Sequence, residues 1–208
     1  MALTNKLTAL ADAIREKTGG TSPLTIDQMT SEISNLQVGG GVDSGLVDAM
    51  IDRTITEIKS DVSIVSDHAF YTCKSLVSAE FPNATKINSN GLRDCLVLTS
   101  VSIPNVTDLM SSSFRGDQRL TKLDLPKVEK LYTNVFTGCT QLETLIFRAN
   151  KVCSMSNVNI LSDTPIEDGT GYVYVPSGLV DSYKKATNWS TYADQIRAIE
   201  DYPEITGG

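Results

Sequence analysis

The 208-residue chain has little of what enzymes and nucleic-acid-binding proteins commonly need. Its one histidine, His68, excludes a histidine-based catalytic triad or a multi-histidine metal site within one chain. No cluster of lysine or arginine interrupts a formal net charge of −7, so no phosphate-binding surface is indicated. No apolar run approaches the roughly 20 residues of a membrane-spanning helix. We therefore expect a non-enzymatic protein without cofactor, metal, nucleic-acid partner or membrane insertion.

The sequence also lacks a Cys-x-x-Cys pair and, after Met1, the basic and apolar regions of a classical signal peptide. These absences indicate synthesis and retention of reduced thiols in a cytoplasm. Three of the four cysteines share one position of a repeat, and the fourth, Cys153, falls in the column of Val65 described below. We therefore expect buried, stacked, unbonded thiols. The four residues are Cys73, Cys95, Cys139 and Cys153.

What the sequence does contain is a pattern that recurs every 22 residues between residues 65 and 152. Several columns of apolar residues and prolines follow the same step. They are Phe70, Leu92, Phe114 and Phe136; Leu76, Leu98, Leu120 and Leu142; Val65, Ile87, Leu109 and Leu131; and Pro82, Pro104 and Pro126. Independent columns in one register predict an array of repeats. Because a unit of about 22 residues cannot close its own core, neighbouring units must stack into a solenoid.

Each unit is expected to contain one short strand with alternating faces. In residues 120–126, Leu123 and Leu125 should point inward, whereas Lys122 and Asp124 should point outward. Pro126 lacks an amide donor, so it belongs at the bend where the strand leaves the ladder. The expected fold class is therefore α+β and rich in β structure.

The first 37 residues read as a helical hairpin, because apolar residues recur at steps of three and four along two segments. A glycine-rich linker, residues 38–43, follows. The hairpin could pack on the repeats, on copies of itself or on another protein; the linker favours self-association or docking. The residues expected to mediate oligomerisation are Leu3, Leu7, Leu10, Ile14, Ile26, Met29, Ile33 and Leu36.

The solenoid domain, residues 44–208, should be closed at both ends, because an open coil exposes core. Its first cap, residues 44–64, comprises a helix from about Gly45 to Asp52 and a strand at 54–58. Its second cap, residues 153–208, comprises a final strand at 172–175 and a helix that Ser177 caps. Trp189 should cover the last coil.

Outward-facing columns are the candidate ligand surface, since amides and hydroxyls around an aromatic anchor suit a carbohydrate or a protein. A merely solvated face is the alternative. A third column, Lys86, Asp108 and Lys130, alternates in sign and is expected to hold neighbouring coils together. The two candidate columns are Asn88, Met110, Tyr132 and Ser154, and Ser78, Ser100, Lys122 and Thr144.

The repeats resemble the BspA-type leucine-rich repeats. Residues 66–76, Ser-Asp-His-Ala-Phe-Tyr-Thr-Cys-Lys-Ser-Leu, are similar to the consensus of that family, and residues 134–142 repeat it. Residues 174–184, with the Asn-Trp-Ser of 188–190, look like the cap that closes such arrays. One unit departs from the pattern, because Asp117 stands where cysteine or asparagine is expected. The geometry of that turn is therefore open.

Residues 7–19 and 24–29 resemble the start of tail and baseplate proteins of phages and prophages from Gram-positive bacteria. In those proteins a helical hairpin and a glycine linker often precede BspA-type repeats. The resemblance implies a virion protein, made in the bacterial cytoplasm, that contacts other virion proteins and a protein or cell-wall carbohydrate. The alternative is an intracellular phage protein that binds a host protein, such as a defence component.

Overall fold

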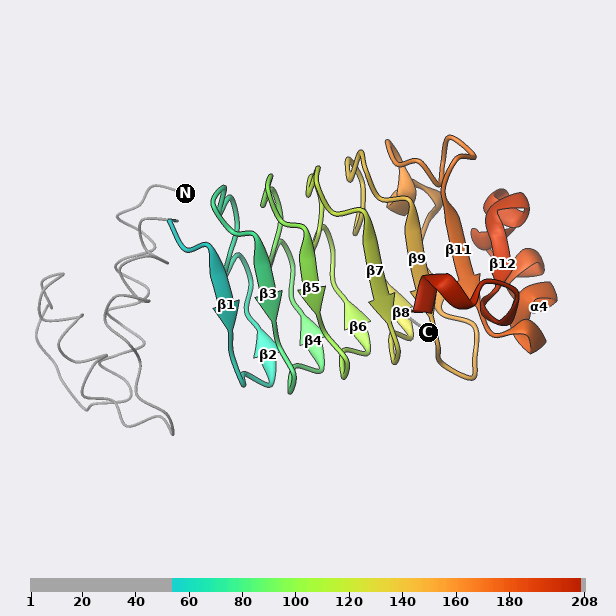
Figure 1. Cartoon of the computed structure of the whole chain (residues 1–208), viewed down its shortest axis with the longest axis horizontal. Coiled ribbons are helices and arrows are strands. Elements are labelled where there is room, and N and C mark those ends of the chain that lie inside the picture. Colours follow the sequence, from blue (N-terminus) through green and yellow to red (C-terminus); the bar gives the residue numbers. More distant parts are fainter. Residues whose placement is uncertain (1–53, 207–208) are drawn as a thin grey trace, which may run out of the picture. The chain divides into compact units, whose positions relative to one another are not determined.

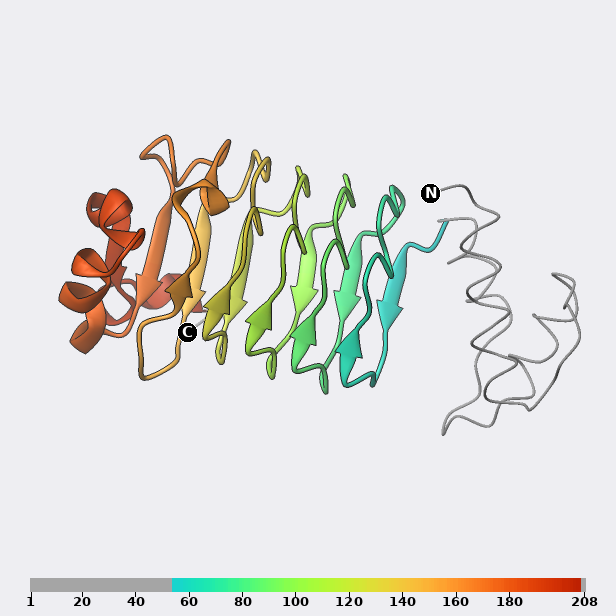
Figure 2. The same ribbon diagram turned by 180° about the vertical axis from the view of Figure 1, so that it is seen from behind.

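The structure, a computed structural model, describes residues 54–206, which belong to one compact unit. Short parallel strands lie side by side along the array (Figure 1). From β1 to β10 each coil supplies one strand to each of two bands, whereas β11 and β12 belong to the first band alone. The first band consists of β1 (Glu57–Lys59), β3 (Ser78–Glu80), β5 (Ser100–Ser102), β7 (Lys122–Leu125), β9 (Thr144–Phe147), β11 (Tyr172–Val175) and β12 (Ile196–Ala198). The second band consists of β2 (Ile64–Val65), β4 (Lys86–Ile87), β6 (Asp108–Leu109), β8 (Lys130–Leu131) and β10 (Ser154–Met155) (Figure 2).

Helices are short and lie at the carboxyl-terminal end of this unit (Figure 1). They are η1 (Val158–Leu161), η2 (Ser177–Leu179), α4 (Val180–Lys185), η3 (Trp189–Gln195), η4 (Ile199–Asp201) and η5 (Pro203–Thr206), all of them 3₁₀ helices except α4. None of the helices within residues 54–206 has the length and apolar character required to cross a bilayer.

The core consists of the predicted repeat columns. Leu76, Leu98, Leu120 and Leu142 are all 0% exposed, and the column that begins at Phe70 is also buried. In β7, Leu123 and Leu125 point into the core, whereas Lys122 is exposed, as the alternation predicted. Strand pairing follows the same period, since Ser78 lies opposite Ser100 and Lys122 opposite Thr144. The repeat register is therefore confirmed for these coils.

The register changes at β10, and here the sequence-based alignment is wrong. Leu131 lies opposite Met155, not Cys153, so the connection between β9 and β10 is two residues longer than its equivalents. The additional residues follow Phe147, where this coil has Arg148 instead of a proline. Arg148 forms a bidentate ion pair with Asp124 of the preceding coil, with a shortest N–O distance of 2.8 Å. The insertion lies at the end of the last 22-residue unit, and the next strand of the first band, β11, pairs with β9 at a spacing of 28 residues. No later unit therefore continues the 22-residue period that could have revealed it.

Two turn positions of each coil adopt a left-handed backbone conformation. The backbone φ is positive at two columns of equivalent residues. The first column is His68, Asn90, Ser112 and Asn134. The second column is Thr72, Asp94, Gly116 and Gly138. Only glycine adopts this conformation without steric cost, and asparagine and aspartate tolerate it better than β-branched residues do. The repeated Asn, Asp and Gly residues of the turns are thus explained by backbone geometry.

Thr72 is the least favourable residue in these columns, because its β-branched side chain is held at a φ of 59°. Replacing it by glycine, the residue used at the same position by the third and fourth coils, should increase the free energy of unfolding by about 0.5–1 kcal/mol. The reverse change, Gly138→Thr, should decrease it by about 1–2 kcal/mol. Thermal unfolding followed by circular dichroism measures both; a lower melting temperature for Thr72→Gly would contradict the assigned strain.

The thiol column is buried, as predicted, and no disulfide joins its members. The Cys95 thiol donates a hydrogen bond to the Phe70 carbonyl at 3.1 Å, and the Cys139 thiol donates to the Phe114 carbonyl at 3.0 Å. Burial raises the pKa of both thiols, which makes them poor nucleophiles. These cysteines therefore act as small core residues that also satisfy backbone carbonyls.

Asp117 occupies the same column without altering the turn. Its amide donates to the Phe114 carbonyl at 3.3 Å, as the amide of Cys139 does to Phe136 at 3.0 Å. Its side chain is 0% exposed; one oxygen, Oδ1, accepts the Cys95 amide at 2.8 Å, and Oδ2 has no partner. Burial raises the pKa of this carboxyl well above its usual range, and the nearby Asp94 adds to the increase. Burial in this core therefore favours the protonated form of Asp117 more than solvent does.

Aromatic residues cover the last coil. Trp189 is fully buried and its Nε1 donates to the Cys153 carbonyl at 2.6 Å, while the Cys153 amide donates to Tyr183 Oη at 2.9 Å. Two details differ from prediction. The strand at 172–175 is β11 but not the last, because β12 pairs with it. Ser177 lies in η2 and does not cap α4, whose N-cap residue is Leu179.

Several predictions fall outside residues 54–206. They concern the helical hairpin at 1–37 with its oligomerisation residues, the linker at 38–43 and the short helix at about 45–52. The strand expected at 54–58 is β1, which begins three residues later at Glu57.

Candidate functional site

The two candidate surface columns lie on different sheets. Asn88, Met110 and Tyr132 directly follow β4, β6 and β8, and each donates its amide to the coil before it. Ser78 and Ser100 pair in the sheet β1-β3-β5, and Lys122 and Thr144 pair in the sheet β7-β9-β11-β12. The two bands are seen from either side in Figures 1 and 2. The structure therefore does not bring the two columns together into one site.

Ser154 was assigned to the wrong column. It lies opposite Lys130 on β8, so it continues the column of Lys86 and Asp108. The position after Tyr132 in its own column belongs to Ser156, whose amide donates to the Leu131 carbonyl at 3.1 Å. The cause is the two-residue insertion before β10. Ser154 nevertheless stays beside Tyr132, because β8 and β10 are adjacent strands.

The second candidate column is partly covered by the end of the chain. Lys122 Nζ donates to the Ile205 carbonyl, so η5 lies against β7. On the neighbouring strands the outward-facing Ile146 and Tyr174 are buried, and the Tyr174 ring packs against Tyr202 with centroids 5.3 Å apart. Ser78 and Ser100, on β3 and β5, lie on the polar part of this band. The column is therefore not one continuous open face.

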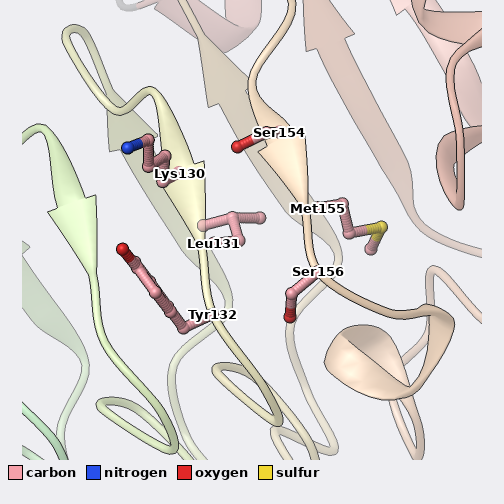
Figure 3. Close-up of a pocket in the computed structure, with 6 residues that line it drawn as sticks. All are labelled: Lys130, Leu131, Tyr132, Ser154, Met155 and Ser156. Atoms are coloured by element: carbon pink, nitrogen blue, oxygen red, sulfur yellow. The ribbon is translucent and has the colours of Figure 1, made fainter.

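A shallow hollow lies between β8 and β10, on the column that contains Tyr132. Its volume is about 170 Å³, and it is lined by Lys130, Leu131, Tyr132, Ser154, Met155 and Ser156. Figure 3 shows Lys130, Tyr132 and Ser154 projecting to one side of the two strands, and Leu131 and Met155 to the other. Leu131 and Met155 are buried, with exposed fractions of 2% and 6%. The surface offered to a ligand therefore comes chiefly from the polar residues and the tyrosine ring.

Ion pairs link neighbouring coils, but not in the predicted column. Lys86, Asp108 and Lys130 lie opposite one another in register, yet no ion pair joins them within 4.0 Å in the described part of the chain. Asp108 Oδ2 instead accepts the Thr107 hydroxyl at 2.7 Å. Coils are linked by Lys59 with Glu80, at 2.8 Å, and by Lys151 with Glu129, at 2.7 Å. The ammonium of Lys130 is thus left to face solvent at the hollow.

The described residues show no metal centre, since none of their His, Cys, Asp and Glu side chains form a group of three that could hold an ion. His68 lies in a turn, where its ring contacts Asn90 at 3.1 Å and packs edge-on against Tyr71. Its backbone φ of 59° places it in the left-handed turn column. Its observed contacts are those of a turn residue.

Comparison with known families identifies the repeats. The family model of the BspA type leucine rich repeat region matches residues 51–163 in six copies. The chain belongs to this family. BspA-type arrays are leucine-rich repeat scaffolds, a class whose members commonly mediate binding to proteins or surfaces. The six copies extend beyond the four units that the 22-residue columns defined, at both the amino-terminal and the carboxyl-terminal sides.

Several solved structures are similar to this chain. A leucine rich cell surface protein from Faecalibacterium prausnitzii matches with a TM-score of 0.50 and 21% identity, over 66% of this chain and 34% of that one. The T. pallidum leucine rich repeat protein matches with a TM-score of 0.48 and 20% identity, over 56% and 54%. The pneumococcal vaccine antigen PcpA matches with a TM-score of 0.48 and 17% identity, over 68% and 39%. This chain thus spans about a third to a half of these proteins. No curated protein matches the sequence significantly.

Proposed function

We propose that the protein is a non-enzymatic phage virion component, of the tail or baseplate, whose repeat array binds a ligand on the host surface or in the virion. The observation that carries the binding role is the hollow between β8 and β10, where the Tyr132 ring lies beside the unpaired ammonium of Lys130. The virion role is supported by the resemblance of residues 7–19 and 24–29 to phage tail and baseplate proteins. Residues 1–37 would attach the array or oligomerise it.

The arrangement of the array suits a binding role. Repeat coils hold outward-facing side chains at fixed spacing on a rigid ladder, so a ligand meets a preorganised surface. An aromatic anchor surrounded by hydroxyl groups combines apolar contact with hydrogen bonding. The interrupted register beside β10 makes this pair of strands different from the regular pairs before it. Tyr132 is therefore the residue on which we expect binding to depend most.

Binding of fluorescently labelled full-length protein to intact Gram-positive cells and isolated wall polysaccharide tests this proposal. We expect saturable binding that Tyr132→Ala weakens at least about tenfold, as the loss of an aromatic anchor typically does. Lys86→Ala, an outward-facing change two coils away, serves as the control and should bind like the wild type. Mass spectrometry of purified phage particles tests the virion role.

Two results would contradict the proposal in different ways. Absence of the protein from purified particles would refute the virion role. Absence of any binding to cells or wall material would refute a host-surface ligand, and a specific cytosolic partner in pull-downs would then favour the intracellular function.

A further inference from the structure

The polar side chains at the hollow between β8 and β10 are not occupied by other parts of the described chain. Lys130 Nζ, Tyr132 Oη and Ser156 Oγ form no hydrogen bond or ion pair within residues 54–206. Ser154 Oγ donates to the Glu129 carbonyl at 3.2 Å, and its lone pairs can still accept. The hollow therefore combines one cation, one aromatic face and hydroxyl groups that can both donate and accept.

Lys130 is the one charged side chain among the residues that line the hollow, although the whole chain is acidic. Glu129, the acid next in sequence to Lys130, is held by Lys151 at 2.7 Å. Asp108, opposite Lys130 on β6, accepts the Thr107 hydroxyl at 2.7 Å. Neither carboxylate forms an ion pair with Lys130 within residues 54–206. An anionic group on a ligand would thus meet an ammonium that no contact neutralises.

The size and chemistry of the hollow favour a sugar over a protein side chain. Its volume of about 170 Å³ is smaller than the roughly 300–1,000 Å³ of pockets that enclose drug-sized molecules, so it suits one ring-sized unit of a longer ligand. Protein partners anchor in desolvated apolar sockets. Here the apolar residues Leu131 and Met155 are buried beneath the surface. A sugar ring can instead place its apolar face on Tyr132 and its hydroxyl groups on the serines.

We infer that the hollow binds one acidic sugar unit of a surface polysaccharide, with the sugar ring on Tyr132, its anionic group on Lys130 and its hydroxyl groups on Ser154 and Ser156. This inference rests on the proposed binding function and names its ligand class. The required anion is a carboxylate or phosphate attached to a sugar. Lys86 occupies the position equivalent to Lys130 in an earlier coil, but Asn88 stands there in place of the tyrosine. The chain thus contains its own matched control site.

Titration of the full-length protein with defined glycans tests the inference. The probes are a hyaluronan tetrasaccharide, its carboxyl-reduced neutral counterpart, and a tetrasaccharide that carries phosphate groups on its sugar rings, which distinguishes carboxylate from phosphate. We expect Lys130→Gln to raise the Kd for the bound anionic probe about fivefold, as loss of one exposed charge interaction does. Tyr132→Ala should raise it at least about tenfold. Lys86→Gln should leave it unchanged, and all three variants should retain the melting temperature of the wild type.

Salt dependence and the neutral probe provide the decisive comparisons. The Kd of the wild type for the anionic probe should rise with salt more steeply than that of Lys130→Gln, because screening weakens an exposed charge contact. Equal affinity for the neutral counterpart, or no binding of either anionic probe, would overturn the inference. If the Lys130→Gln and Tyr132→Ala variants still bound cells like the wild type, the proposed binding function would stand and this site would be refuted. If the wild type bound no cells, the proposed host-surface function itself would fail.

Discussion

Replacing Leu120 by aspartate is expected to unfold the repeat array. Leu120 is 0% exposed, and its column runs through every central coil. Removing a buried leucine side chain costs about 2–5 kcal/mol, and a carboxylate left without a partner in the core adds a further penalty. Together these approach the 5–15 kcal/mol by which domains are typically stable. Far-UV circular dichroism and limited proteolysis at 25 °C should both report loss of the folded coils.

The control places the same charge two residues away. Gln118 is exposed in the turn that leads to Leu120, so Gln118→Asp should change stability by no more than about 0.5 kcal/mol. Lys122→Ala should cost about 1 kcal/mol or less, because its exposed side chain forms a hydrogen bond to η5. Equal losses for Leu120→Asp and Gln118→Asp would refute the register of the array.

The repeat core was predictable because one period constrains many residues at once. A slip by one residue would move Leu123 and Leu125 to the solvent face, so the alternation determined which side of β7 is buried. The insertion before β10 left no such mark. Residues 148–151, Arg-Ala-Asn-Lys, are compatible with a coil of either 22 or 24 residues. Only the strand pairing of Leu131 with Met155 distinguishes them.

The candidate site was predictable in part. Tyr132 was identified because it is the one aromatic residue in an outward-facing column, and the hollow contains it. Lys130 had been assigned to a structural ion-pair column, since sign alternation indicates attraction but not whether side chains meet. The cover that η5 provides over Lys122 depends on a contact between residues 83 positions apart. No local pattern predicts such a contact, because the carboxyl-terminal segment folds back onto a strand that is distant in the sequence.

Replacing Asp117 by asparagine is expected to stabilise the protein at neutral pH. The buried carboxyl accepts the Cys95 amide through Oδ1, and an asparagine oxygen can do the same. The equivalent thiols of Cys95 and Cys139 each donate to a carbonyl 25 residues earlier, and for position 117 that carbonyl belongs to Leu92. Either an amide or a protonated carboxyl at this position can therefore donate, whereas a carboxylate cannot. Asp117→Cys should stabilise for the same reason.

The stabilisation should depend on pH with a defined sign. Because the folded pKa of Asp117 lies above its unfolded value, the native state retains this proton and its stability falls as pH rises from about 4 toward the folded pKa. Each pH unit in that window costs about 1.4 kcal/mol, so the penalty at pH 7 is at most about 4 kcal/mol. Asp117→Asn removes the penalty. Urea unfolding should therefore show a gain over the wild type that is largest near pH 7 and vanishes near pH 4.

An exposed acid provides the opposite control. Asp124 is held by Arg148, so Asp124→Asn should lose up to about 1 kcal/mol at pH 7 where Asp117→Asn gains. Both substitutions remove one negative charge from an acidic chain, so a general effect of net charge would move the two in the same direction. Gains of equal size for the two variants, or a gain for Asp117→Asn that stays constant between pH 4 and pH 7, would show that the buried carboxyl is not the source. A gain that is confined to position 117 and shrinks as the pH falls is the result expected of a carboxyl whose pKa is raised by burial in this core.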